Sequence, residues 1–372
     1  MKWIFWLSVA FITYTYAGYL GWLWLRSKLR PWPVRRGLME PGVSIVMAVR
    51  NEEQVLERKL GNLFALDYPA ERCQVVVVSD GSTDRTEEIL REHAGNSQLY
   101  TVMNQLSRGK AAGLNSGIEV AQGEIVVFTD ARQTIEAEAV RLLVQSFADP
   151  DVGCASGELM LGDGAGESER GMGLYWRIEK KVREMESVSS SVVGATGALY
   201  AVRRELVTTI PEGTILDDVY LPMQVARQGK RVVFDPRARA WDDPDLGGPR
   251  EFARKVRTLS GNYQLLQLAP WLLSGDNPIR FEFVSHKLLR LGVPFALVTA
   301  FVSCAFIGGT FYRVCLILQA LFYVSSLLAM QNVELGFVSR VSDAALTFVL
   351  LNSAAAVAFA NFVTGKKVAW TR

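Results

Sequence analysis

The stretch that decides the fold is Gly123-Glu124-Ile125-Val126-Val127-Phe128-Thr129-Asp130-Ala131-Arg132. Its four central apolar residues are too few for a helix and rich in β-branched types, so they predict a strand buried on both faces. Asp130 follows the carboxyl end of this strand, the edge at which open α/β sheets bind ligands. A carboxylate there suits a metal ion or a polar ligand, and a simple cap of a helix starting near Ile135 is the alternative.

The hydrophobic residues, 49% of the 372-residue chain, concentrate at its two ends. Residues 3–25 carry no charge over about the twenty positions that a bilayer-spanning helix needs, and no small-residue cleavage pattern follows, so they predict a retained anchor. Only Lys2 precedes the anchor, whereas several basic residues follow it, so the positive-inside rule places the next segment in the cytoplasm. These basic residues are Arg26, Lys28, Arg30, Arg35 and Arg36.

Three apolar runs near the other end predict about three further spans. They cover about residues 288–309, 314–330 and 344–363. One anchor and three spans would leave Lys366, Lys367 and Arg372 on the outer side, against the charge rule. The number of C-terminal spans therefore stays open, as does the alternative of long buried helices in a soluble protein.

Charge and cysteine content exclude several classes of protein. The net charge of +2 gives no support for a nucleic-acid partner. The four cysteines and two histidines have no spacing typical of a zinc site or a disulfide framework. Free thiols that pack as small hydrophobic residues are expected instead.

The polar region between the apolar ends, residues 40–274, alternates strand-like and helix-like segments. Apolar runs at 43–49, 74–79 and 125–128 predict strands. Helices are predicted at 51–66, after the N-cap oxygens of residues 82–84, and at 110–120. This order indicates an α/β fold with a mostly parallel central sheet and right-handed crossovers.

Polar residues follow the predicted strands and should face one crevice. Asn51 follows the first strand, Asp80 ends the second and Asp130 the third. Asp80 could accept hydrogen bonds from a base or ribose, and Asp130 could hold a divalent cation that offsets phosphate charge. Lys110 follows Gly109 at a helix start, a suitable place for a cation near phosphate. Taken singly, each has a plain structural explanation, such as a turn at Asp80-Gly81.

Together these motifs resemble glycosyltransferase family 2, the inverting nucleotide-sugar transferases with a GT-A fold. The resemblance runs from Val43 to about Gln267 and rests first on three segments. They are the Asn51-Glu52 turn after the first strand, Ser79-Asp80-Gly81-Ser82-Thr83-Asp84, and Gly109-Lys110-Ala111-Ala112-Gly113-Leu114-Asn115. It implies that Asn51, Glu52, Asp80 and Lys110 bind the nucleotide sugar, with Asp80 on the uridine.

Asp130-Ala131-Arg132 occupies the place of the family's Asp-x-Asp metal motif. The second acid is replaced by Arg132, and a guanidinium cannot ligate a cation. Arg132 could instead contact the diphosphate bidentately. The resemblance still implies Mg²⁺ or Mn²⁺ as cofactor, with Asp130 as the metal anchor.

Two later segments are expected beside the donor sugar and the acceptor. In residues 193–200, Thr196 and Gly197 resemble the family's segment where glycine lets the backbone come close, and a turn joining two strands is the alternative. Asp217 occupies the place of the family's Glu and Asp218 that of the catalytic base. Two acids that merely favour a helix N-terminus are the alternative.

The last motif is Arg254-Lys255-Val256-Arg257-Thr258, in the place of the Gln-x-x-Arg-Trp motif of processive members. The resemblance implies that Arg257, and Arg254 beside it, bind the diphosphate. Thr258 replaces the tryptophan expected under the acceptor sugar, which weakens the case for chain elongation. A basic amphipathic helix on the membrane surface fits as well, with Leu265, Leu266, Leu268, Trp271 and Leu272 in lipid.

The expected protein is a membrane-embedded inverting glycosyltransferase of a bacterial inner membrane. It resembles the branch of chitin-oligosaccharide, poly-N-acetylglucosamine, hyaluronan and cellulose synthases, which implies a UDP-sugar donor and a growing cell-surface glycan as acceptor. One sugar added to a membrane lipid, and a non-catalytic nucleotide-sugar-binding scaffold, are the alternatives. The expected parts are an anchor (1–27), a cytoplasmic GT-A domain (40–250), interfacial helices (251–280) and a transmembrane region of about three spans (281–372).

Overall fold

The computed structural model describes residues 1–162, 174–242, 248–329 and 337–366. The chain forms two compact units. The sheet unit comprises Leu23–Pro244 and Leu265–Glu282, and the helical unit comprises Met1–Trp22, Asp245–Gln264 and Phe283–Ala369.

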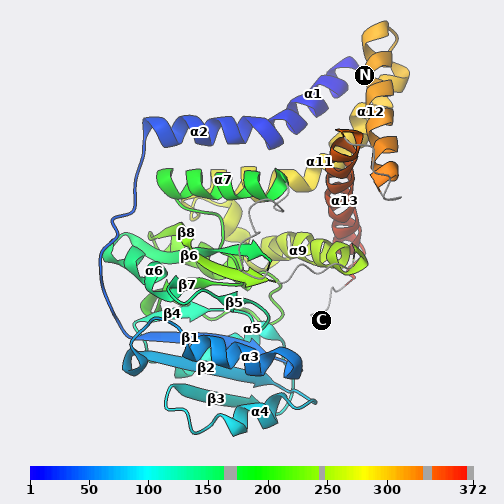
Figure 1. The fold of residues 1–372 in the computed structure, drawn as a ribbon. Helices are drawn as coiled ribbons and strands as arrows, with labels where there is room; N and C mark the ends of the chain where they lie inside the picture. Colours follow the sequence, from blue (N-terminus) through cyan, green and yellow to red (C-terminus); the bar gives the residue numbers. More distant parts are fainter. Residues whose placement is uncertain (163–173, 243–247, 330–336, 367–372) are drawn as a thin grey trace. The chain divides into compact units, whose positions relative to one another are not determined.

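The sheet unit is built on a sheet of eight described strands, in the order β3-β2-β1-β4-β7-β6-β8-β5 (Figure 1). Strand β1 pairs in parallel with β2 and β4, β2 with β3, and β6 with β8, whereas β7 and β5 pair antiparallel with their neighbours. The predicted mostly parallel α/β sheet is confirmed. The strands are β1 (Val43–Val49), β2 (Cys73–Asp80), β3 (Leu99–Asn104), β4 (Ile125–Phe128), β5 (Thr134–Ile135), β6 (Val152–Leu161), β7 (Tyr200–Arg203) and β8 (Arg231–Asp242).

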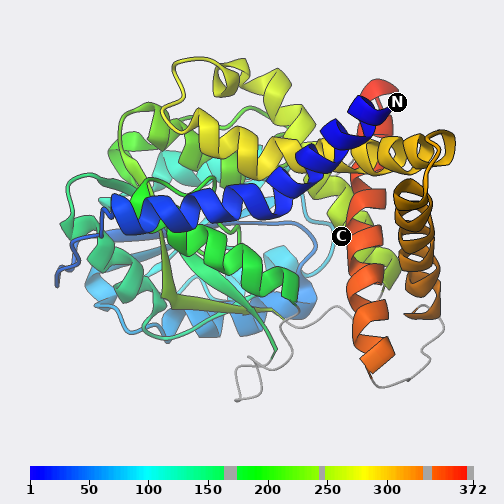
Figure 2. The ribbon, with the colours of Figure 1, turned by 90° about the horizontal axis from the view of Figure 1, so that it is seen from above.

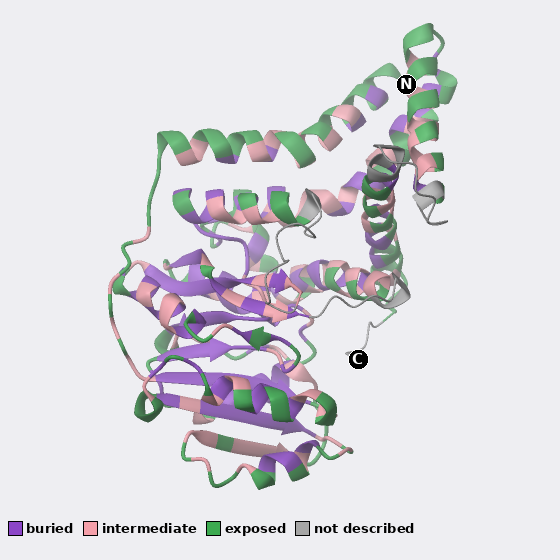
Figure 3. Cartoon of the chain, in the orientation of Figure 1, coloured by how far each residue is buried: buried purple, intermediate pink, exposed green. Residues whose placement is uncertain are grey.

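Alternate residues of β1 pack against helices on opposite faces of the sheet, so this strand is buried on both faces (Figure 3). Ile45 and Met47 share a core with Leu56 of α3. On the other face, a Cβ at Gly117 of α5 would lie 2.5 Å from Val46, so the helix approaches the sheet closely there. The helices of this unit include α3 (Glu53–Phe64), α4 (Thr86–Glu92), α5 (Lys110–Val120), α6 (Ala139–Gln145), α7 (Leu174–Ser189) and α8 (Asp217–Arg227).

The helix expected near Ile135 begins at Ala139 instead. Thr134 and Ile135 form the short strand β5, which pairs with Trp241 and Ala240 of β8. Asp130 therefore does not cap this helix. The sequence pattern missed this strand because two residues are too short to show an alternation.

The helical unit contains the apolar helices. In it, α12 (Thr310–Ala329) and α13 (Phe337–Val363) run side by side in both views (Figures 1 and 2). Phe5 of α1 (Lys2–Thr13) packs against Ala300 and Cys304 of α11 (Leu289–Phe306). Among the described residues, four helices are long and apolar enough to cross a membrane, as predicted: Lys2–Leu29, Arg280–Phe306, Thr310–Leu327 and Ser342–Val363.

Several large apolar side chains of α12 are exposed, among them Leu318, Leu321 and Val324. A contiguous exposed apolar surface of this kind is typical of contact with lipid or a partner. The expected lipid contact of Leu265 and Leu272 is wrong, because both are buried in the sheet unit. All four cysteines are free, as expected.

The basic side chain of Lys59 lies inside the sheet unit. Lys59 occupies the apolar face of α3 beside Leu56, Leu60 and Leu63 and is only 1% exposed. Its ammonium donates to Thr129 Oγ1 (3.0 Å) and to the carbonyl of Gln133 (2.7 Å). Burial lowers the pKa of Lys59 to about 7, although Asp130 opposes the shift.

Because the pKa of Lys59 is lower in the folded than in the unfolded chain, the unfolded chain binds more protons above about pH 7. The free energy of unfolding should therefore rise from pH 7 to 9 relative to the Lys59→Met variant, by up to about 1.4 kcal/mol per pH unit. Unfolding of both proteins at pH 7, 8 and 9 measures this. Lys181→Met, at an exposed position, is the control, and parallel curves for wild type and Lys59→Met would contradict the expectation.

Candidate active site

The parallel strands β1, β2 and β4 bring three predicted residues to one edge of the sheet. Strand β1 pairs with β2 from Val43 onward and with β4 in the same direction, so their carboxyl ends meet. Asn51 follows β1, Asp80 ends β2 and Asp130 follows β4. A ligand-binding site is therefore expected at this edge of the sheet.

Asp80 is fully buried and fixes the loop that leads into α5. Its carboxylate accepts hydrogen bonds from Ser107 Oγ (2.8 Å) and from the backbone N–H groups of Arg108 (3.0 Å) and Gly109 (2.8 Å). Gly109 has a φ of 95°, which favours glycine at the residue before Lys110. Asp80 thus sets where α5 begins, and its contact with the uridine stays a prediction.

The turn after β1 is held by side chain to backbone hydrogen bonds. Asn51 has a φ of 55°, and its Oδ1 accepts from the N–H of Thr83 (2.7 Å). The N–H of Glu52 donates to Thr86 Oγ1 (2.8 Å). These bonds tie the turn to the loop after β2, and nucleotide binding by Asn51 and Glu52 stays a prediction.

Lys110, at the first residue of α5, lies between two of the predicted acids. Its ammonium is 2.9 Å from Asp130 Oδ1 and 3.2 Å from Asp217 Oδ1. Burial by itself lowers the pKa of Lys110, but the neighbouring carboxylates Asp130 and Asp217 outweigh it, so the net shift is upward. Lys110 is therefore a permanent positive charge in the site.

The two adjacent acids at the start of α8 differ in environment. Asp217 is 3% exposed, and burial raises its pKa although Lys110 opposes the shift. Asp218 is half-buried, and its Oδ2 accepts from the N–H of Gly197 (3.1 Å). A Cβ built on Gly197 would lie 3.3 Å from Asp218 Oδ2 and 3.5 Å from Asp130 Oδ2. The carboxylates of Asp130 and Asp218 therefore both lie close to Gly197.

The segment around Thr196 and Gly197 is an irregular turn that leads into β7. The N–H of Thr196 donates to Ser156 Oγ (3.0 Å). Thr129 Oγ1 donates to the carbonyl of Ala198 (2.8 Å) and accepts from Lys59. The structure thus links this turn to the end of β4, and sugar or acceptor contacts of Thr196 and Gly197 stay predictions.

Arg132 has an unforeseen partner. Its Nη2 lies 3.1 Å from Asp242 Oδ2, and the side chain of Gln133 donates to the same carboxylate (3.0 Å). Asp242 lies at the end of β8, more than one hundred residues away in the sequence. No local pattern points to Asp242, whereas the position of Lys59 at the apolar spacing of α3 is a usable signal for its burial. Contact of Arg132 with the diphosphate stays a prediction.

Arg254 and Arg257 lie on α9 (Gly248–Leu268), in the part of that helix that belongs to the helical unit. Arg254 is exposed and Arg257 half-buried. Diphosphate binding by these two residues stays a prediction.

The described residues contain no group of three or more His, Cys, Asp or Glu side chains that could hold a metal ion. Asp130 offers one carboxylate, 38% exposed, and Arg132 adds none. Mg²⁺ is commonly held by one or two carboxylates together with substrate phosphates. The residues therefore fit an ion shared with a bound diphosphate, and they do not form a complete cage.

The arrangement combines an accessible carboxylate, Asp218, with a fixed ammonium, Lys110, and a second carboxylate, Asp130. A carboxylate of this kind can take a proton from a hydroxyl. A fixed ammonium stabilises negative charge that develops on a leaving group. The site is thus equipped for displacement of an anionic leaving group by an alcohol.

Residues 44–210 match the family model "Glycosyl transferase family 2". The chain is 24% identical over 232 residues to poly-beta-1,6-N-acetyl-D-glucosamine synthase of Staphylococcus aureus. The matched region covers 60% of this chain and 55% of that protein. The synthase of Staphylococcus epidermidis is 23% identical over 237 residues, 62% of this chain and 57% of that one. The chain thus spans little more than half the length of these relatives.

The fold is shared with a solved mannosyltransferase, PcManGT from Pyrobaculum calidifontis in complex with GDP-Man and Mn²⁺. The two structures superpose with a TM-score of 0.76 at 24% identity, over 98% of this chain and 100% of the other. This likeness confirms the GT-A type of sheet. The match of residues 44–210 to the family model assigns this part of the chain to glycosyltransferase family 2.

Proposed function

We propose that the protein transfers a sugar from a nucleotide sugar to an acceptor hydroxyl, with inversion at the anomeric carbon. The observation that carries this proposal is that the Asp218 and Asp130 carboxylates both lie close to Gly197, with the ammonium of Lys110 paired to Asp130. The family assignment sets the scaffold alternative aside.

Asp218 is the proposed base. It is the more accessible of the two adjacent acids, and the hydrogen bond that its carboxylate accepts from the N–H of Gly197 orients it. It accepts the acceptor's proton as the oxygen attacks the anomeric carbon, while the nucleoside diphosphate leaves from the opposite face. Asp217, paired with Lys110, holds α8 against α5 and positions Asp218 next to it.

Lys110, Arg132 and Arg257 are the proposed cations for the leaving diphosphate, because each supplies charge or bidentate donors. Mg²⁺ or Mn²⁺ held by Asp130 and the diphosphate would add further positive charge to the leaving group. The solved mannosyltransferase contains Mn²⁺, which supports testing this ion first.

The proposed acceptor is a growing cell-surface glycan and the proposed donor a UDP-sugar. The names of the staphylococcal relatives support a polymer of N-acetylglucosamine. The GDP-Man in the mannosyltransferase complex makes a GDP-sugar the donor to test against it.

A second candidate is the transfer of one sugar to a membrane lipid, such as a polyprenyl phosphate or a ceramide-like alcohol. Thr258 favours it, since a threonine gives an acceptor sugar no aromatic platform. Either reaction would take place at the inner membrane of a bacterium. The basic residues after the first apolar helix would place the sheet unit on the cytoplasmic side.

Membranes that contain the protein, supplied with radiolabelled UDP- and GDP-sugars, test the function. Release of one nucleoside diphosphate with a ladder of product lengths supports the glycan acceptor, and a single glycolipid supports the second candidate. If no sugar is transferred from any donor, the proposal fails.

Asp218→Asn should lower kcat by about 10²–10⁴-fold, since it removes the base while keeping the size of the side chain. Nucleotide affinity, measured by calorimetry, should stay within about threefold because Asp218 is not proposed to touch the nucleotide. Asp276→Asn, at an exposed position of the same unit, should leave both unchanged. Full activity of Asp218→Asn would contradict the mechanism.

Gly197→Ala should lower kcat about tenfold, because the new methyl group would lie 3.3 Å from Asp218 Oδ2 and shift that carboxylate. Gly61→Ala, in α3 with no atom within 4 Å of the new methyl group, is the matched control and should keep wild-type activity. Equal kcat values for the two variants would contradict the need for an exact position of the Asp218 carboxylate.

Removal of divalent ions with EDTA should abolish transfer, and Mn²⁺ or Mg²⁺ should restore it. Asp130→Asn should raise the Mn²⁺ concentration needed for half-maximal rate by about tenfold or more, since it removes the proposed protein ligand. Undiminished transfer in EDTA would show that the cationic side chains act without a metal.

A further inference from the structure

A groove of about 480 Å³ lies in the sheet unit, remote in sequence from the acidic motifs. Its walls come from the end of α2 (Tyr19–Leu29), the segment 33–36, helix α7 and strand β8. The apolar side chains include Trp24, Met185, Val188 and Phe234. None of these takes part in the proposed reaction.

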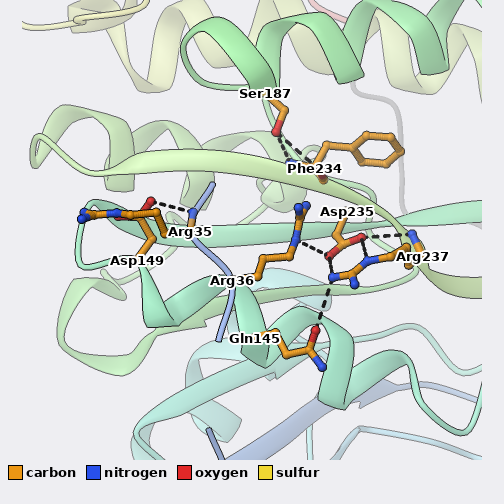
Figure 4. A network of polar contacts seen from close by, with 8 residues as sticks. All are labelled: Arg35, Arg36, Gln145, Asp149, Ser187, Phe234, Asp235 and Arg237. Carbon is orange, nitrogen blue, oxygen red and sulfur yellow. Dashed lines mark hydrogen bonds and ion pairs between the residues drawn. The ribbon is translucent and has the colours of Figure 1, made fainter. Parts of the chain in front are cut away.

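Charged side chains at the groove leave an excess of positive charge. Arg36 Nε donates to Asp235 Oδ2 (3.0 Å), and Arg237 binds the same buried carboxylate through two nitrogens (2.7 and 2.9 Å) (Figure 4). One carboxylate is thus shared by two guanidinium groups. Lys181 is neutralised by Glu184 (3.0 Å), whereas Lys28 adds a further positive charge.

The combination of an apolar wall and a basic rim selects an amphipathic anion. A small soluble anion has no apolar part that could cover the exposed side chains of Trp24 and Val188. Lys28 lies in the last turn of the first apolar helix, Lys2–Leu29, and the headgroups of a membrane lie at such helix ends. Basic residues at this place attract anionic lipids.

We propose that this groove binds an anionic phospholipid. The phosphate would lie between Lys28 and Arg36, and an acyl chain along Trp24 and Val188. The inference rests on the membrane location given under the proposed function and is independent of the sugar-transfer chemistry. The groove is lined by the end of the first apolar helix and by α7. A lipid bound there would therefore hold the sheet unit at the membrane surface.

Native mass spectrometry of the full chain, released from detergent micelles that contain equal amounts of phosphatidylglycerol and phosphatidylcholine, tests the proposal. Wild type should retain phosphatidylglycerol preferentially, and Lys28→Gln/Arg36→Gln should lower its affinity on the order of tenfold. Arg30→Gln/Arg35→Gln removes the same charge from the same segment outside the groove and should retain wild-type binding; Arg35 is directed to Asp149 instead (3.2 Å).

Three results would overturn the inference: equal loss in both double variants, equal retention of phosphatidylcholine, or displacement by glycerol 1-phosphate at equal concentration. If Lys28→Gln/Arg36→Gln does not fold, Lys28→Glu alone, at an exposed position, must show the loss. Extraction of the protein from membranes by carbonate without detergent would show that the membrane location itself is wrong, and the binding assay requires no sugar transfer.

Discussion

The ion-pair cluster of Lys110 with Asp130 and Asp217 is the constraint on which the site depends. It joins the start of α5, the end of β4 and the start of α8. Acidic groups this close would repel one another and resist ionisation in a buried place. The ammonium of Lys110 compensates for them, and its removal would leave buried charge without a partner, which is strongly unfavourable. The cluster therefore fixes the distance between the three elements.

Polar groups that are not proposed to take part in the transfer step hold the backbone around this cluster in place. Asp80 fixes the loop before Lys110 through backbone N–H groups, and Lys59 fixes the end of β4 through Thr129. Gly197 leaves room for two carboxylates and orients Asp218 through its N–H. Because these supports are short hydrogen bonds between packed elements, the site is organised before any substrate arrives.

Two departures from the family pattern have structural consequences. Arg132, in the place of a metal-binding acid, pairs with Asp242 and so connects the loop after β4 to the end of β8. Thr258 takes the place of an aromatic residue on α9. The first reduces the protein's share of a metal site to Asp130, and the second removes a surface on which an acceptor sugar would stack. Both concern how a substrate would be held, while the proposed base, Asp218, and the ammonium of Lys110 are retained.

The sequence by itself determined the strands β1, β2 and β4, the helix α5, the four long apolar helices and the acids at the strand ends. These features follow from local patterns: β-branched runs, apolar length and residues placed directly after a strand. Only the tertiary structure decided that Lys110 joins Asp130 to Asp217, that Asp218 is the accessible acid of the pair, and that Asp242 holds Arg132. Such contacts join residues up to about one hundred positions apart, and their geometry arises from strand order and packing, which no local pattern encodes.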